Sequence, residues 1–268
     1  LAGNAMFYNI VLQSDSLQEK LYTDDTSNIA KTIVNVHIQK LVILGANIPS
    51  LLQKNTIQAK TIEIVRPVIT FISTVKEEQT KFTSADTLAL YEKITGKFKS
   101  IQAGEIKITD GTIALARGKK SPHATLQGVN IDLKNLKIDS TRNYDNLISY
   151  FIKDVKATVT NANIKDEKKD RLLIFDGIEY NAAGRFASVN KFVQNDLRTN
   201  KNLITLRNTH VSGFSTKAFI INREIKADSL TTDGGAIGFF RSKSKSNAGE
   251  TIELDNGFFD EARVKNIR

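Results

Sequence analysis

Side chains able to do acid–base, nucleophilic or metal chemistry are few in this sequence and stand far apart. The histidines His37, His123 and His210 have no second ligand at a spacing typical of a metal site. The absence of cysteine excludes thiolate ligands and thiol catalysis. The carboxylate pairs Asp24-Asp25 and Asp166-Glu167 lack the partners of a glycosidase or calcium site. No nucleophile elbow or phosphate-binding glycine loop occurs, so we expect a non-enzyme without metal or cofactor.

The clearest pattern in the chain is made by apolar residues. Over residues 101–115, apolar and polar residues alternate, pause at Asp110-Gly111 and alternate again. Alternation with a period of two predicts a β-strand with one apolar face. The pause has two interpretations. A two-residue hairpin would set Ile108 opposite Ile113, whereas a single strand would continue through a bulge that resets the alternation.

Residues 57–71 carry the same pattern 44 positions earlier, without a gap. Weaker copies lie near residues 159–164, 204–211, 225–239 and 252–259. Several copies in one chain predict a repeated β unit, and their irregular spacing argues against a strict solenoid. The apolar residues that the two clear copies share are our candidates for the lining of a groove: Ile62, Ile64, Ile69, Phe71, Ile106, Ile108, Ile113 and Leu115.

An apolar strand face has two functional interpretations. In an open, curled sheet it lines a groove that holds acyl chains, and in a closed sandwich it forms a dry core. Periodicity does not separate these alternatives, because both remove the same residues from water.

The elements that position these residues are mostly strands. The alternation slips between Ile38 and Leu41 and again at Asn135, which indicates further bulges. A short helical turn is expected at 48–52, and apolar residues at helical spacing predict an amphipathic helix near 85–99. We therefore predict an all-β, mostly antiparallel fold: one elongated curled sheet of irregular repeats with one or two short amphipathic helices, forming a single domain over residues 1–268.

The composition fits a folded chain with an affinity for anionic surfaces. Charged residues make up 25% of the 268 residues and the net charge is +9. The basic residues are scattered over strands and loops, and no concentrated patch with aromatic residues suggests nucleic-acid binding. No apolar run approaches the roughly 20 residues that span a bilayer. The chain begins without an initiator Met, and we expect it to be part of a longer protein.

The segments Ile62-Glu63-Ile64-Val65-Arg66-Pro67-Val68-Ile69 and Val129-Asn130-Ile131-Asp132-Leu133-Lys134-Asn135-Leu136 resemble strands of the AsmA-like family of bacterial envelope proteins, which includes the TamB-type proteins. The resemblance extends over about residues 30–260 and rests on apolar spacing. It implies a membrane anchor that precedes this chain, a periplasmic body of elongated curled β-sheet, and a role in moving phospholipid or maintaining the outer membrane.

Two functions follow as expectations. In the first, the chain is a periplasmic segment, tethered to the inner membrane, whose apolar groove binds phospholipid or another acyl lipid. Its further partners would be an anionic membrane surface and an envelope protein. In the second, the chain is a structural or adhesive sandwich or β-solenoid of a cell-surface protein that binds polysaccharide or protein. A hydrolase assembled from strand ends has no motif in its support.

Overall fold

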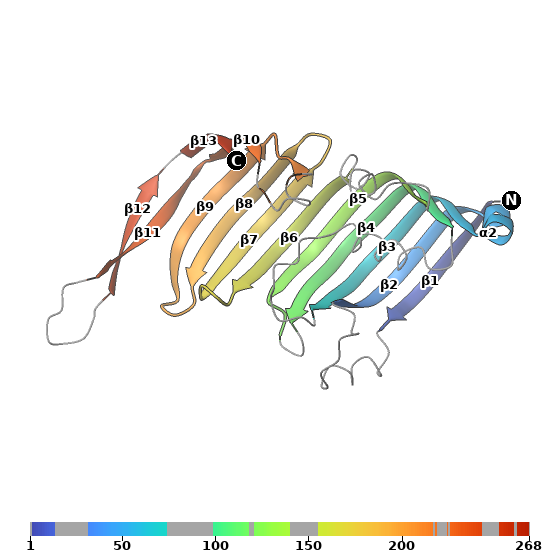
Figure 1. Ribbon diagram of the computed structural model, residues 1–268, viewed down its shortest axis with the longest axis horizontal. Helices are drawn as coiled ribbons and strands as arrows, with labels where there is room; N and C mark the ends of the chain where they lie inside the picture. The colour runs from blue at the N-terminus through green and yellow to red at the C-terminus, as the bar shows by residue number, and fades with distance from the viewer. Residues whose placement is uncertain are drawn as a thin grey trace.

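The computed structural model describes residues 2–13, 32–73, 99–117, 121–139, 155–216, 218, 224, 226–242, 252–259 and 262–267. Within these residues the chain forms one sheet of 13 strands and one short helix (Figure 1). The sheet is elongated and its two ends do not close on each other. The predicted all-β class, with an elongated curled sheet, is confirmed.

The strands lie beside one another almost in chain order. Their bounds are β1 (Ala2–Leu12), β2 (Thr32–Asn47), β3 (Thr56–Ser73), β4 (Ser100–Arg117), β5 (Ala124–Asp139), β6 (Val155–Asp166), β7 (Arg171–Asn181), β8 (Phe186–Asp196), β9 (Lys201–Ser212), β10 (Ala227–Thr232), β11 (Gly234–Ser242), β12 (Ile252–Phe259) and β13 (Ala262–Ile267). One half of β9 pairs with β10 and the other half with β11. Neighbouring strands are antiparallel except for β3 and β4.

The helix α2 (Ile48–Lys54) follows β2 directly and confirms the predicted helical turn. Asn47 caps it, since its side-chain oxygen accepts a hydrogen bond of 3.1 Å from the backbone N–H of Ser50. Asn55 ends it in the left-handed conformation. The second predicted helix, near 85–99, falls mainly on residues outside the described part of the chain.

Asp110-Gly111 lies inside a strand. β4 runs unbroken from Ser100 to Arg117, and its pairing with β5 shifts between Ile108 and Thr112. Asp110 has a positive φ of 54° and donates its backbone N–H to the side chain of Asn130 at 3.0 Å. The hairpin interpretation is therefore wrong, and the interpretation as one strand with a bulge is confirmed.

The two clear sequence copies form the parallel pair. Each paired residue of β3 stands beside the residue of β4 that is 44 positions later, from Thr56 beside Ser100 to Ser73 beside Arg117. Equivalent polar residues consequently meet: Gln58 donates to Gln102 at 3.0 Å, and Arg66 forms a 3.2 Å ion pair with Asp110. The sequence repeat of 44 residues therefore corresponds to the register in which β3 and β4 pair.

Bulges form a row across the sheet. Residues with positive φ recur at the same level of successive strands, as the pairs on either side of them show, and in this row they are Asn9, Arg66, Asp110, Gly128, Gly177 and Asn208. A shorter row places Gly45 beside Lys60, Gly104 and Asn135. Each row resets the alternation of side chains, which explains the slips near Ile38 and Asn135.

The hairpins that join β6 to β9 share one construction. Asp166, Asn181 and Asp196, spaced 15 residues apart, each accept backbone N–H groups from the turn that follows. Four residues after each of them stands a residue with positive φ: Asp170, Arg185 and Asn200. Carboxylate and amide oxygens stabilise such turns by bonding the chain ahead of them, so this half of the sheet has a repeated turn that sequence analysis missed.

The turn at Asp196 gives a prediction for stability against pH. Its side-chain oxygen accepts the N–H groups of Thr199 and Arg198, both at 2.9 Å. The hydrogen bond from Thr199, with smaller contributions from Arg198, holds the pKa of Asp196 below its usual value. A lowered pKa means that this stabilisation is complete above the unfolded value of about 3.9 and is lost as pH falls below it. We expect Asp196→Asn to unfold at lower urea concentration than wild type at pH 7.

The same comparison at low pH provides the control. Because Asp196 of the unfolded wild type binds a proton below its usual pKa of about 3.9, whereas the folded protein opposes this, the difference between the two urea midpoints should shrink as pH is lowered from about 5 toward 3. A difference that stays constant over this range would show that the charge of Asp196 does not stabilise the turn.

Candidate functional site

The pairing register assigns the side chains to two faces of the sheet. Residues directly opposite each other on paired strands point to the same side. Ile62 stands beside Ile106, and Ile64 beside Ile108. Allowing for the reset at the bulge row, all eight predicted groove residues lie on one face of β3 and β4, which we call the apolar face: Ile62, Ile64, Ile69, Phe71, Ile106, Ile108, Ile113 and Leu115.

The apolar face extends well beyond these two strands. On one side Leu41 of β2 pairs with Ile64, and on the other side Ile131 of β5 pairs with Ile108. Continuing the register from β1 to β9 adds further apolar side chains that sequence analysis did not nominate: Phe7, Leu41, Ile43, Leu126, Ile131, Leu133, Phe175, Phe192 and Leu206. Phe175 and Phe192 stack with their ring centroids 4.9 Å apart. The strands that carry these residues also show alternating apolar and polar residues in the sequence, which could have identified them.

The apolar face is partly open. Each of the eight predicted residues is half-buried and none is fully buried. Among the buried apolar residues of the sheet are two small clusters, one around Ala103, Leu133 and Leu136 and another around Val129, Val159 and Ala162. All strands of the described residues belong to the same sheet, so this part of the chain contains no second sheet against the apolar face.

Polar side chains mark the end of the apolar face at β7 and β8. Leu173 pairs with Gln194 and, at the strand ends, Arg171 pairs with Asp196. Arg198 lies 3.6 Å from Asp196 in the turn beyond. A ligand that lies on the apolar face would therefore meet basic groups and hydrogen-bonding groups at this border.

The opposite face is polar and carries alternating charges. Across four strands Glu63, Lys107, Asp132 and Lys156 stand in one row, each beside an opposite charge. Lys107 also contacts Glu105 at 3.0 Å, and this hydrogen bond, with the surrounding carboxylates, raises the pKa of Lys107. Alternating charges on a water-exposed strand face favour the observed register, and they offer no uniform surface for a polyanion.

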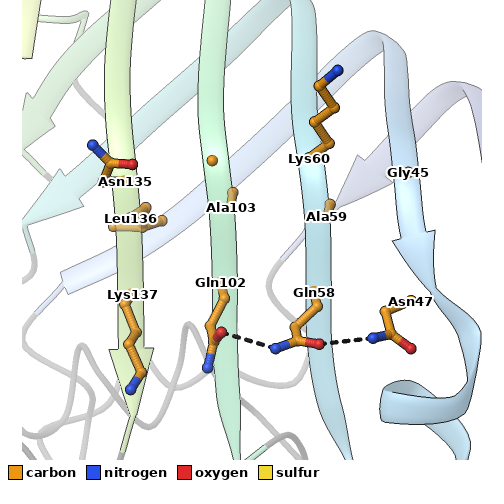
Figure 2. Close-up of a pocket in the computed structure, with 11 residues that line it drawn as sticks. Gly45, Asn47, Gln58, Ala59, Lys60, Gln102, Ala103, Asn135, Leu136 and Lys137 are labelled. Atoms are coloured by element: carbon orange, nitrogen blue, oxygen red, sulfur yellow. Dashed lines mark hydrogen bonds between the residues drawn. The ribbon is translucent and has the colours of Figure 1, made fainter. Parts of the chain in front are cut away.

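An open hollow of about 490 Å³ lies at the shorter bulge row, where Gly45, Ala59, Ala103 and Gly104 leave space (Figure 2). Its amides bond to one another: Asn47 donates to Gln58, and Gln58 donates to Gln102, both at 3.0 Å. Since these groups already have partners, the amide chain explains how β2, β3 and β4 are held in register, and it does not define a ligand site.

The histidines lie on different strands and do not converge. His37 is exposed on β2, and His210 of β9 stacks on Phe186. His123 joins three strands through its backbone, donating to Leu115 and accepting from Lys165. Burial, followed by the charge of Arg117, lowers the pKa of His123. In the part of the chain that the structure describes, no group of three His, Cys, Asp or Glu side chains gathers to hold a metal.

The fold and its two unlike faces define a class, that of open single-sheet β proteins with one apolar and one polar face. No protein-family model matches the chain, and no curated protein matches it significantly. No helix among the described residues is long and apolar enough to cross a membrane. The apolar face is therefore the main structural feature that bears on function.

Proposed function

We propose that the apolar face binds lipid acyl chains, and that the chain is a non-enzymatic segment that holds or conducts phospholipid in a bacterial envelope. The observation that carries this proposal is the continuous apolar face from β1 to β9, on which the eight candidate residues of β3 and β4 are half-buried. A dry core would bury the same side chains completely.

The physical basis is the removal of acyl chains from water. Each methylene that leaves water gains about 0.8 kcal/mol, so about ten buried methylenes supply about 8 kcal/mol against the cost of association. The headgroup would remain at a basic border such as Arg171 and Arg198, at the ends of β7 and β8. This mechanism needs no catalytic residue.

The surroundings of the protein form part of the same proposal. The resemblance to AsmA-like proteins supports a periplasmic location, with a tether to the inner membrane outside these residues. The net charge of +9 supports contact with an anionic membrane surface. An envelope protein would be a further partner.

Cysteine labelling tests whether lipid occupies the apolar face. The chain contains no cysteine, so Ile64→Cys and Ile108→Cys each create a single thiol in place of a side chain of similar character. We expect both thiols to react with a maleimide in lipid-free protein, because both positions are half-buried. Added phosphatidylglycerol in mixed micelles should slow both reactions at least about fivefold, since bound acyl chains cover the face.

Val68→Cys is the matched control, because Val68 lies on the polar face of β3 and is 43% exposed. Its labelling should not change with lipid. Equal slowing at all three positions would indicate that the micelle shields the protein generally. Unreactive thiols at positions 64 and 108 in lipid-free protein would show a covered core and contradict the proposal.

A further inference from the structure

On strands β7 and β8 the two ends of the apolar face differ in chemistry. At one end Arg171 pairs with Asp196, and at the other end Tyr180 pairs with Ala187. Between these ends the apolar side chains of both strands are half-buried. We call these five residues the β7–β8 strip: Leu173, Phe175, Ile178, Val189 and Phe192.

The chain that follows β9 closes the Tyr180 end of the strip. The N–H of Phe214 donates at 3.0 Å to the carbonyl of Arg185, in the turn between β7 and β8. The ring of Phe214 stands edge-on to that of Tyr180 with their centroids 6.3 Å apart, and the hydroxyls of Thr216 and Tyr180 are hydrogen-bonded. Tyr180 lies on the apolar face, two strands away from β9. The segment 213–216 therefore crosses the end of β8 on the apolar side.

The opposite end of the strip presents a guanidinium held in place. With its amide turned toward Arg171, Gln194 accepts hydrogen bonds from Nε at 3.3 Å and from Nη1 at 2.8 Å. Gln194 is only 9% exposed, so it fixes the guanidinium from within the sheet. Two of the five N–H groups of Arg171 are used in this way. A planar guanidinium matches the oxygens of a phosphodiester.

Two carboxylates stand beside this guanidinium, and both are engaged by their own turns. Asp166 and Asp196 pair with Arg171 on either side. Asp166 accepts the backbone N–H groups of the turn that follows it, and Asp196 does the same and also lies 3.6 Å from Arg198. Because turn N–H groups and Arg198 balance these charges, an anion can approach Arg171.

We propose that the β7–β8 strip seats a phospholipid in one orientation, with its phosphodiester on Arg171 and an acyl chain directed toward Tyr180 and Phe214. This inference rests on the proposed lipid function, to which it adds a direction and a headgroup-binding residue. Tyr180 is seven residues after Leu173, at most about 23 Å along the strand. An acyl chain fills about 15 Å, half of a bilayer core of about 30 Å, so it fits between the guanidinium and the closing segment.

Nitroxide-labelled phosphatidylglycerol tests the orientation. The chain contains no tryptophan, so Leu173→Trp and Ile178→Trp each supply a single fluorescent reporter. The nitroxide is placed either near the headgroup or near the end of one acyl chain. We expect Leu173→Trp to be quenched at least twofold more by the label near the headgroup and Ile178→Trp by the label near the chain end, because the two positions lie about 16 Å apart along β7. The reverse order, or the same order at both positions, would overturn the proposal.

Arg171→Gln tests the headgroup contact independently of the tryptophan variants. It should weaken phosphatidylglycerol binding at least about fivefold and leave binding of diacylglycerol, which has no phosphate, unchanged. Arg207→Gln is the matched control, because Arg207 is exposed on the polar face of β9 beside Lys191. Phosphatidylglycerol binding that Arg171→Gln leaves intact, or an equal loss for both lipids, contradicts the proposal.

The cysteine labelling at positions 64 and 108 separates this proposal from the function on which it rests. Protection of those thiols by lipid, together with a failed quenching or Arg171 test, would refute the fixed orientation and leave the proposed function supported. Absence of that protection would contradict both. Circular dichroism of each variant establishes that it is folded before lipid is added.

Discussion

Replacing Ile108 by Asp is expected to reduce phospholipid uptake by about tenfold or more. Ile108 lies at the centre of the apolar face, between Ile64 on one neighbouring strand and Ile131 on the other. An acyl chain crossing this point would have to desolvate the new carboxylate and would lose contact with the isoleucine, and a loss of about 1.4 kcal/mol already corresponds to tenfold in affinity. Uptake is measured with a phospholipid that carries a fluorescent acyl chain.

Thr109→Asp is the matched control, because Thr109 is the next residue, exposed on the polar face. It should take up lipid like wild type. Circular dichroism and the thermal midpoint establish whether both variants fold. Where Ile108→Asp does not fold, Ile108→Thr decides, since it keeps a β-branched side chain and should show intermediate uptake. A folded variant at Ile108 with wild-type uptake would exclude the apolar face as the lipid site.

Much of the apolar face could be predicted from the sequence because its physical cause is local. Burial on one side of a strand places apolar residues at every second position. Ile62 and Ile64, and likewise Ile106 and Ile108, show this spacing directly in the sequence. The gapless copy at 57–71 predicted equivalent apolar positions. The structure places those positions side by side in the parallel pair β3–β4, so the repeat and the sheet register agree.

Other features depend on information that local sequence does not hold. Asp110-Gly111 has the composition of a tight turn, and only its long-range pairs with Asn130 and Arg66 show that it is a bulge inside a strand. Arg66 adopts positive φ although its residue type does not favour it. The apolar side chains on both faces of β1 were visible in Met6-Phe7-Tyr8. Which of them point to the apolar face follows only from the pairing of β1 with β2.

Replacing Gly177 by Ala is expected to lower the free energy of unfolding by about 2–5 kcal/mol. Gly177 belongs to the long bulge row and has a φ of 64°, which costs an L-residue about 1–2 kcal/mol. A Cβ there would also lie 2.1 Å from the side-chain nitrogen of Asn190 on the neighbouring strand, so that side chain must move. Overpacking of this kind adds about 1–3 kcal/mol. Urea unfolding measures the sum.

Two further variants separate the contributions. Gly184→Ala is the control, because φ there is not positive and the nearest atom to a Cβ would be 3.5 Å away, so its stability should stay within about 0.5 kcal/mol of wild type. Adding Asn190→Ala to Gly177→Ala removes the two closest contacts but leaves the Cβ of residue 190 at 3.1 Å and the positive φ. The double variant should recover only the overpacking part of the loss. Gly177→Ala as stable as Gly184→Ala would show that the bulge row tolerates a side chain, and that the alternation of the apolar face does not depend on glycine there.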